Sequence, residues 1–597
     1  MAGHNIEIVM RKVFPLYIIP FLLFACEKPE SGSGNEGGGE SGYVTTWRSL
    51  EGGEASLNSH AGAVSRSNIT LIGGTYVQIP GEQLMMLSED TGVVYPRFVK
   101  TGAGDYLMFY HYGNKSTWAG NYCSYARSSD LVNWKFEGKL FKTQPGQSSR
   151  EADGKPFTRV FAGADLCTLP DGRIMVVASF RGADFRHRIK DNGLAIRFSS
   201  DNGKTWTEDK LVYVGTNWEP KPLVLPDGTI QIYYTDSRPF IENIWKRSVV
   251  SSGSSYIWSE DGGRSWKPSN PEVNHVTAFK ERRIAARDTV VYTDQMPAVI
   301  CLNGTTRLAA AMEADRGQER GDSLYSDMYV SLAWSGDNYD WGTPDANGRI
   351  PSDRADWYTK GAAPYLAQFL SGETVLTYNA SNIFYYRIGN EGARNFGAQQ
   401  RVFPGDSPTG RGFWGSVYIT GPQTMVAGVG GTSTVKMMQV GQFWLNHDIE
   451  ARQMSVKTDG SASEWKHKEA LLCGSSSDSH VILRAAKDAQ KLHLLVEVEG
   501  TGAYAKVELG VGGSLKSTVL QSYGLNSSDF RGAEAQSISG TTRDGVNGFT
   551  SELSIPLSEF GSQKTVPVKL SLLLPGGKVE SFNLTSQAVE SLPQIKL

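Results

Sequence analysis

Charged side chains recur at two kinds of position along this sequence, each tied to the ends of apolar strands. The first kind lies where such a strand begins and includes Arg97, Asp165 and Glu219; the second lies where the next strand ends and includes Asp236 and Glu313. Two carboxyl groups in one site can divide the roles of acid and base, because burial and a neighbouring negative charge separate their pKa values. The pattern predicts chemistry of this kind if the fold brings these positions together.

The elements that carry these residues form a repeat between residues 43 and 446. Each unit is an apolar strand, a turn with a glycine, a second apolar strand and a further strand, with the turns at Gly104, Gly172, Gly228, Gly304, Gly372 and near Gly421. Six such units predict an all-β fold in which six four-stranded blades surround an axis. The first strand of each blade then lines the axis, and ligands sit over one of its mouths.

A second motif follows two of the hairpins. Residues 199–206 and 259–266 both read Ser-x-Asp-x-Gly-x-(Thr/Ser)-Trp, and residues 128–134 and 335–341 are looser copies. In such a turn Asp accepts hydrogen bonds from backbone amides, Gly takes a positive φ and Trp covers the turn. The motif resembles the Asp-box of sialidase-type β-propellers; a repeat of this length also suits a kelch-like propeller, but the boxes favour the sialidase type.

The chain from residue 447 to 597 has a different pattern. Asp459-Gly460 and Trp465 are followed by an alternating strand over 491–499 and by the segment GFTSELSIPL from Gly548. This order resembles β-sandwiches of the family-9-like carbohydrate-binding modules. A sandwich that only seats on the propeller remains an equal alternative, and Trp465 is either a sugar platform or part of the core.

The first 42 residues have the pattern of a targeting signal followed by a flexible linker. A basic start and an apolar run over 13–25 end at Leu23-Phe24-Ala25-Cys26, which resembles a bacterial lipobox and makes Cys26 the expected lipidation site, with 1–26 as the signal peptide. Residues 27–42 are rich in Gly, Ser and Glu and predict a flexible linker. We therefore expect an envelope protein that a lipid at Cys26 holds on a membrane, with an ordinary signal peptide as the alternative.

Composition excludes several classes of protein. The 597 residues carry 59 Lys and Arg against 62 Asp and Glu, which argues against nucleic-acid binding. A mean hydropathy of −0.32 excludes a protein with many membrane spans, and five cysteines are too few for a disulfide scaffold. The sequence has no zinc, Walker or dinucleotide motif, so we expect no metal and no cofactor. We also expect a monomer.

Four segments carry a closer resemblance. YPRFVKTGAGDYLMFY, NWEPKPLVLPDGTIQIYYTDS, DQMPAVICLNGTTRLAAAMEA and FWGSVYI are similar, in this order, to glycoside hydrolase family 93, the exo-acting α-L-arabinanases on six-bladed sialidase-type propellers. The resemblance implies a retaining exo-glycosidase with two catalytic glutamates, which are Glu219 and Glu313 here. We expect Glu219 to be the acid/base and Glu313 the nucleophile, with the reverse open. Insertions near 241–250 and 271–289 exceed the family pattern and can reshape the pocket.

Other residues at the predicted mouth can bind the sugar. Arg97, Asp165 and Asp236 either orient hydroxyl groups or form structural salt bridges, and Trp218 and Trp414 either stack on sugar faces or pack inside the fold. The substrate we expect is a polysaccharide or oligosaccharide.

Two alternative functions remain open. An exo-α-sialidase is favoured by the basic cluster at 186–190 and by the place of Arg97, but the sequence reads Tyr-Pro-Arg rather than Arg-Ile-Pro, and no Tyr–Glu pair identifies itself. The other alternative is a non-catalytic surface lipoprotein that binds glycans, for which Glu219 and Glu313 need not be close.

Overall fold

The computed structural model describes residues 64–77, 91–114, 122–141, 144–147, 156–182, 192–237, 252–269, 276–279, 293–316, 318–320, 323–325, 327–343, 350–351, 353–403, 413–430, 438–474, 479–500, 504–543, 545–582, 584 and 588–597. The predicted lipidation site Cys26, the flexible linker, the basic cluster at 186–190 and the insertion at 241–250 lie outside these ranges. No helix among the described residues is long and apolar enough to cross a membrane.

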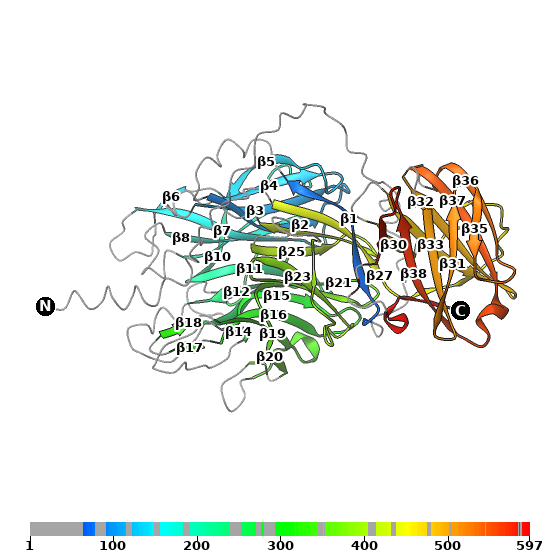
Figure 1. The fold of residues 1–597 in the computed structure, drawn as a ribbon. Coiled ribbons are helices and arrows are strands. Elements are labelled where there is room, and N and C mark those ends of the chain that lie inside the picture. Colours follow the sequence, from blue (N-terminus) through cyan, green and yellow to red (C-terminus); the bar gives the residue numbers. More distant parts are fainter. Residues whose placement is uncertain are drawn as a thin grey trace.

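Six antiparallel sheets follow one another around an axis and form a β-propeller (Figure 1). The first three blades are β2 (Thr91–Lys100), β3 (Tyr106–Asn114), β4 (Tyr122–Ser128) and β5 (Lys135–Phe141); β7 (Pro156–Thr168), β8 (Ile174–Gly182), β9 (Gly193–Ser199) and β10 (Lys210–Val214), with β6 (Gln144–Gln147) beside β7; and β11 (Asn217–Val224), β12 (Ile230–Asp236), β13 (Gly253–Ser259) and β14 (Val276–Phe279).

The other three blades complete the ring. They are β15 (Gln295–Cys301), β16 (Leu308–Asp315), β19 (Met328–Trp334) and β20 (Arg354–Lys360), with a ribbon of β17 (Gln318–Arg320) and β18 (Ser323–Tyr325); β21 (Ala362–Gln368), β22 (Thr374–Ala380), β23 (Ile383–Gly389) and β24 (Gln400–Arg401); and β25 (Phe413–Ile419), β26 (Thr424–Gly430), β27 (Met438–Asn446) and β1 (Asn68–Val77). The predicted all-β class with a six-bladed propeller is confirmed.

The second strand of each blade is an almost continuous apolar run because both of its faces pack against neighbouring blades. Every residue of β8, β16 and β26 is buried. The turns that precede these strands place Gly104, Gly172, Gly228, Gly304 and Gly372 at positive φ, as predicted for hairpins of this kind. Only the turn near Gly421 uses a different conformation.

The two Ser-x-Asp segments fold as tight turns at the outer ends of blades 2 and 3. Asp201 accepts hydrogen bonds from the backbone N–H of Lys204 and Thr205 and from the Thr205 hydroxyl. Asp261 makes the same kind of contact with the backbone and side chain of Ser265, and Trp266 packs inside the fold. These carboxylates hold backbone and are therefore structural.

An N-terminal strand closes the ring. Strand β1 pairs antiparallel with β27 and is the outermost strand of blade 6, so this blade contains both ends of the propeller chain. The Arg66 guanidinium binds the Asp448 carboxylate at 2.5 Å just beyond the paired strands. The repeat in the sequence did not predict this strand.

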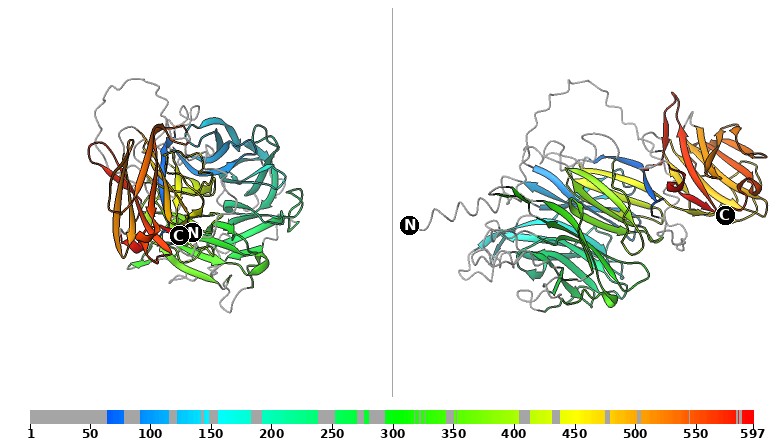
Figure 2. Two further views of the ribbon diagram at one scale, coloured as in Figure 1. Left: turned by 90° about the vertical axis from the view of Figure 1, so that its right-hand side faces the viewer. Right: turned by 60° about the horizontal axis from the view of Figure 1, so that its bottom comes forward.

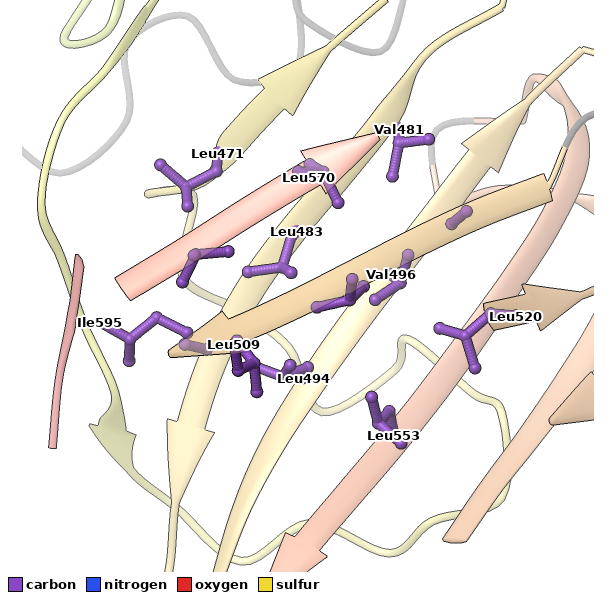
Figure 3. Close-up of a cluster of buried hydrophobic side chains, with 14 of the residues drawn as sticks. Leu471, Val481, Leu483, Leu494, Val496, Leu509, Leu520, Leu553, Leu570 and Ile595 are labelled. Atoms are coloured by element: carbon purple, nitrogen blue, oxygen red, sulfur yellow. The ribbon is translucent and has the colours of Figure 1, made fainter. Parts of the chain in front are cut away.

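The last part of the chain is a β-sandwich. One sheet contains β28 (Ile449–Glu450), β40 (Gln594–Lys596), β38 (Thr565–Leu573), β33 (Tyr504–Val511), β34 (Ser514–Gln521) and β35 (Gly524–Ser528), with β39 (Val579–Ser581) paired to β38; the other contains β29 (Arg452–Gln453), β31 (Val481–Lys487), β32 (Lys491–Glu499), β37 (Asn547–Pro556) and β36 (Glu534–Thr541), with β30 (Leu471–Cys473) paired to β31. Figure 3 shows the leucines and valines that fill the space between the sheets. The predicted C-terminal sandwich is confirmed.

Trp465 belongs to the interior of this sandwich. Its side chain is 1% exposed, and its indole N–H donates to the Glu552 carboxylate at 2.8 Å. Ala486 and Leu495 pack around it. Trp465 is therefore part of the core and not a platform for a sugar.

The sandwich contacts blade 6 at the edge of the propeller (Figures 1 and 2). Two side-chain amides hold its backbone by paired hydrogen bonds: Gln423 binds the N–H and C=O of Ala470, and Asn446 binds those of Leu472. The buried His447 lies beside this contact, 3.1 Å from a Glu373 carboxylate oxygen and 3.7 Å from that of Glu469. Polar groups that are fully paired in this way fix the two domains in one arrangement.

Candidate active site

A β-bulge at the same position of every innermost strand shapes the axis of the propeller. The pairing register shifts in each of these strands. The first bulge residue has a φ between 44° and 59° in all six blades: Tyr95, Gly163, Glu219, Met296, Ala363 and Trp414. Five of the six are not glycine, although a left-handed conformation is costly for other residues. Such bulges turn a side chain away from the regular alternation and toward the axis.

The residues that follow the bulges meet at the axis. Asp165 Oδ2 lies 3.4 Å from Arg97 Nε and 3.6 Å from Lys221 Nζ, and it accepts a hydrogen bond from the Tyr365 hydroxyl at 2.9 Å. Lys221 Nζ in turn donates to the Tyr365 oxygen at 2.6 Å. Four blades thus contribute one buried network of two cations, one anion and a phenol.

Arg97 is occupied by this network and by backbone. One guanidinium nitrogen donates to the carbonyl oxygens of Pro96, Trp414 and Gly415 at 2.9–3.3 Å, and the guanidinium lies over the Tyr365 ring at 4.9 Å. Arg97 therefore joins blade 1 to blade 6 and has the salt bridge to Asp165 that was one of its two predicted roles.

A polar residue near the end of the second strand holds the bulge of the following blade. Thr235 Oγ1 accepts the N–H of Met296 at 2.8 Å, Glu313 Oε2 accepts that of Ala363 at 2.9 Å, and Asn379 Oδ1 accepts that of Trp414 at 3.1 Å. The three acceptors occupy equivalent places in the pairing register of blades 3, 4 and 5. Glu313 therefore has one oxygen committed to backbone.

Both oxygens of Glu219 accept hydrogen bonds from side chains. The Tyr95 hydroxyl donates to Oε1 at 3.2 Å and the Thr235 hydroxyl donates to Oε2 at 3.0 Å. The single proton of Thr235 must point toward Glu219, because the same hydroxyl already accepts the N–H of Met296. This arrangement suits an ionised carboxylate.

The electrostatic environment raises the pKa of both glutamates. Burial of the carboxyl raises the pKa of Glu219 to about 7, against the opposing effects of Thr235, Arg181 and Tyr95. Burial, and next the charge of Glu219, raise the pKa of Glu313 to about 8. The two carboxyl groups therefore influence each other, and at neutral pH Glu313 is the one that more readily keeps a proton.

Aromatic rings surround the pair. The Tyr95 ring stacks on Trp414 at 5.1 Å and on His111 at 6.0 Å between ring centroids. Burial, and next the charges of Glu219 and Glu313, raise the pKa of the Tyr95 phenol well above its ordinary value, so the phenol stays neutral. The Arg181 guanidinium lies 3.3 Å from the centroid of the Trp218 ring.

A cavity of about 300 Å³, including the solvent at its mouth, opens on this arrangement. Its walls include Tyr95, Glu219 and the axial network of Arg97, Asp165, Lys221 and Tyr365. Glu313 is not among the lining residues, but the N–H that it binds belongs to Ala363, next to the lining residue Pro364. Of the two glutamates, Glu219 is thus the one that lines this space.

The structure places the residues predicted to bind substrate in different surroundings. Glu219, Arg97 and Asp165 meet at the cavity, Trp414 lies against Tyr95, and Trp218 lies against Arg181. Asp236 is buried and accepts a hydrogen bond from Ser255 of the neighbouring strand at 3.2 Å, so we assign it a structural contact.

The sequence analysis missed Thr235, Lys221 and Tyr365, and it gave no role to Tyr95, although Tyr95 opens the first segment quoted for the family resemblance. Tyr95, Lys221 and Thr235 stand inside the segments quoted for the family resemblance, with Thr235 immediately before Asp236, whereas Tyr365 lies outside them. An alignment of the six blades at their bulges would have found them, because each lies within two residues of a bulge or pairs with the residue just before one. Among the residues that the structure describes, no group of three or more His, Cys, Asp or Glu side chains is arranged to hold a metal ion.

Comparison with known proteins finds distant similarities. No known protein family matches the chain. A fructan β-fructosidase of Streptococcus mutans is 24% identical over 165 residues, which are 28% of this chain and 10% of that protein. This chain therefore spans about a tenth of the length of that relative.

Among the solved structures that are similar to part of this chain are two sialidases. A Hadza microbial sialidase is 13% identical, with 59% of this chain and 65% of that one covered and a TM-score of 0.38. The intramolecular trans-sialidase from Ruminococcus gnavus is 9% identical, with 59% and 94% covered and a TM-score of 0.37. Since these scores are low, the assignment of the fold rests on the sheet topology.

Proposed function

We propose that this protein is a retaining exo-glycoside hydrolase with Glu219 and Glu313 as its catalytic pair. The observation that supports this most directly is the placement of the half-buried Glu219 at the cavity and of the buried Glu313 on the adjacent blade, close enough for the charge of Glu219 to raise the pKa of Glu313. A retaining glycosidase needs one ionised carboxylate and one protonated carboxyl about 5–5.5 Å apart.

The hydrogen bonds favour the reverse of the roles first expected. Glu219 accepts hydrogen bonds at both oxygens, which stabilises the ionised form and suits a nucleophile. Glu313 has Oε2 committed to the Ala363 N–H, so its proton belongs on Oε1 and suits transfer to a leaving group. In the first step Glu219 attacks the anomeric carbon while Glu313 gives its proton to the departing oxygen; in the second, Glu313 takes a proton from water, which releases the sugar from Glu219.

The substrate that we propose is an arabinan-type polysaccharide, cut from its non-reducing end. This part rests on the four segments similar to glycoside hydrolase family 93. We further propose that the lipobox places the enzyme in a bacterial envelope, anchored at Cys26.

A sialidase remains a second candidate because of one contact. The Tyr95 hydroxyl donates to Glu219, which is a Tyr–Glu pair of the kind that the sequence alone did not identify. Against this candidate stands Arg97, whose guanidinium binds three backbone carbonyls and Asp165. Few N–H groups of this guanidinium therefore remain to bind a substrate carboxylate.

One experiment distinguishes these candidates. The purified protein is incubated with linear arabinan and with a sialylated glycan, and the released monosaccharide is identified by chromatography. We expect arabinose from wild type and none from Glu219→Gln. Release of sialic acid alone would support the sialidase, and undiminished hydrolysis by Glu219→Gln and Glu313→Gln would contradict both mechanisms.

A further inference from the structure

His111 occupies in blade 1 the place that Glu313 occupies in blade 4. It pairs with Val94, the residue just before the bulge of its blade, as Glu313 pairs with Gln295. Thr235 and Asn379 hold the same register position in blades 3 and 5. All four side chains therefore hold equivalent register positions, each opposite the residue that precedes a bulge.

The role of His111 differs from that of its counterparts. Thr235, Glu313 and Asn379 each accept a bulge N–H from the following blade, whereas among the described residues neither ring nitrogen of His111 has a hydrogen-bond partner. The side chain is only 7% exposed. A buried polar group without a hydrogen-bond partner destabilises the folded protein, and such groups in native proteins usually have a functional or structural reason.

The chemistry of the ring suits a sugar. Burial lowers the pKa of His111 to about 4, so the imidazole is neutral at the pH at which Glu219 and Glu313 share a proton. A neutral imidazole has one nitrogen that donates and one that accepts. Sugar hydroxyl groups both donate and accept, so they can satisfy the two nitrogens.

The position of the ring also suits a sugar. Its centroid lies 6.0 Å from that of Tyr95, whose hydroxyl binds Glu219. His111 is thus one aromatic ring away from the carboxylate that we assign as nucleophile. Both of its nitrogens are closed to solvent, so a hydroxyl group reaches them only when the half-buried Tyr95 or another neighbouring side chain shifts.

We propose that His111 binds hydroxyl groups of the terminal sugar and so helps to determine which sugar the enzyme accepts. The proposal rests on the proposed glycosidase function. It predicts that the two buried nitrogens lower the stability of the free protein and are satisfied on binding, so the substitution of this residue changes affinity and stability in opposite directions.

The test uses binding to the full chain with Glu219→Gln, in which turnover is removed. His111→Phe keeps the ring that stacks on Tyr95 and removes both nitrogens, and His111→Asn keeps one donor and one acceptor. Affinity for arabinotriose and for sialyllactose is measured by calorimetry, and Tm by thermal unfolding. The matched control is His467→Phe in the sandwich, where a buried histidine also has a nitrogen without a hydrogen-bond partner.

We expect His111→Phe to weaken binding of the accepted oligosaccharide about tenfold, with an unchanged or higher Tm, because removal of an unsatisfied buried group is neutral or stabilising. His111→Asn should recover part of the affinity, and His467→Phe should leave it unchanged. Equal affinity of His111→Phe, or a fall in its Tm without a change of affinity, would show a structural role and overturn the proposal. If the Glu219→Gln parent binds neither oligosaccharide, the glycosidase proposal fails and this one fails with it.

Discussion

Carboxylates at the rim and at the axis of the propeller are the same chemical group in opposite environments. At the rim, Asp201 and Asp261 accept several hydrogen bonds from the hydroxyl groups and backbone of their own turns, which lowers their pKa well below the ordinary range. At the axis, burial raises the pKa of Glu219 and Glu313. A carboxylate saturated by local donors holds a turn together, and one that is buried with few donors is available for proton transfer.

A third carboxylate shows that burial alone does not make the difference. Glu373 is fully buried at the domain contact, yet its pKa is lowered, because the hydrogen bond and charge of His447 outweigh the effect of burial. The same contact raises the pKa of His447. For Glu373, His447 and the Ser371 hydroxyl together therefore reverse the effect that burial has on Glu313.

The largest expected effect is on the axis. Glu313→Gln cannot give or take a proton, so we expect kcat/KM to fall by about 10²- to 10⁴-fold. In wild type, kcat/KM should rise with pH through the pKa of Glu219, about 7, and fall through that of Glu313, about 8. The variant should lose the fall on the basic side; a basic limb that persists in Glu313→Gln would contradict its role as the acid.

The next effect is on stability. His447→Ala leaves Glu373 buried without its partner, and we expect the free energy of unfolding to fall by roughly 3–5 kcal/mol. Because the folded pKa of His447 is raised, its contribution is complete below the unfolded pKa and is lost as pH rises through the folded one. Glu373 behaves in the opposite way and contributes until pH falls through its lowered pKa. Chemical denaturation at several pH values measures both, and a loss that does not vary with pH would contradict the ion pair.

A smaller effect is expected from Thr235→Val, which keeps the shape of the side chain and removes both the hydrogen bond to Glu219 and the one from the Met296 N–H. Since the first of these bonds lowers the pKa of Glu219, its loss should move the acidic limb of kcat/KM to higher pH and reduce the maximum about tenfold. Thr235→Ser should restore both. An acidic limb that does not move would show that Thr235 acts only on the bulge.

The smallest effect is expected at the rim. Asp261→Ala removes the acceptor of the Ser265 turn, and we expect Tm to fall by roughly a few degrees with kcat/KM unchanged. Asp201→Ala should behave in the same way. A loss of activity at unchanged Tm would show that the rim carboxylates differ less from the axial ones than their environments indicate.

The repeat made much of this fold predictable. The glycine turns located the hairpins, and the residues expected at the starts of the first strands lie at the bulges: Glu219 is the first residue of one bulge, and Arg97 and Asp165 directly follow two others. Four bulge residues can be recognised in the sequence because a proline directly follows each of them: Tyr95, Glu219, Met296 and Ala363. Local chemistry was enough for these positions.

Long-range contacts were not predictable in the same way. Tyr95 and Glu219 are 124 residues apart, and nothing local to either indicates the hydrogen bond between them. Asp236 was expected at the mouth, but the strand places Thr235 there, because a shift of one residue moves a side chain to the other face. The roles of the two glutamates depend on donors from other strands and blades for the same reason.

Closure of the ring by β1 also has a consequence for folding. Asn68 and Asn446 bind each other across 378 residues of sequence, whereas the hairpins within each blade join neighbours. By the logarithmic law of loop closure, a contact at that distance costs about 3 kcal/mol more than one across ten residues. On a ribosome, β1 is synthesised first and its partner β27 comes after nearly the whole propeller, so blade 6 is the last to be completed. The sandwich is synthesised directly after blade 6. It binds this blade through Asn446 and so stabilises the pairing of β1 with β27.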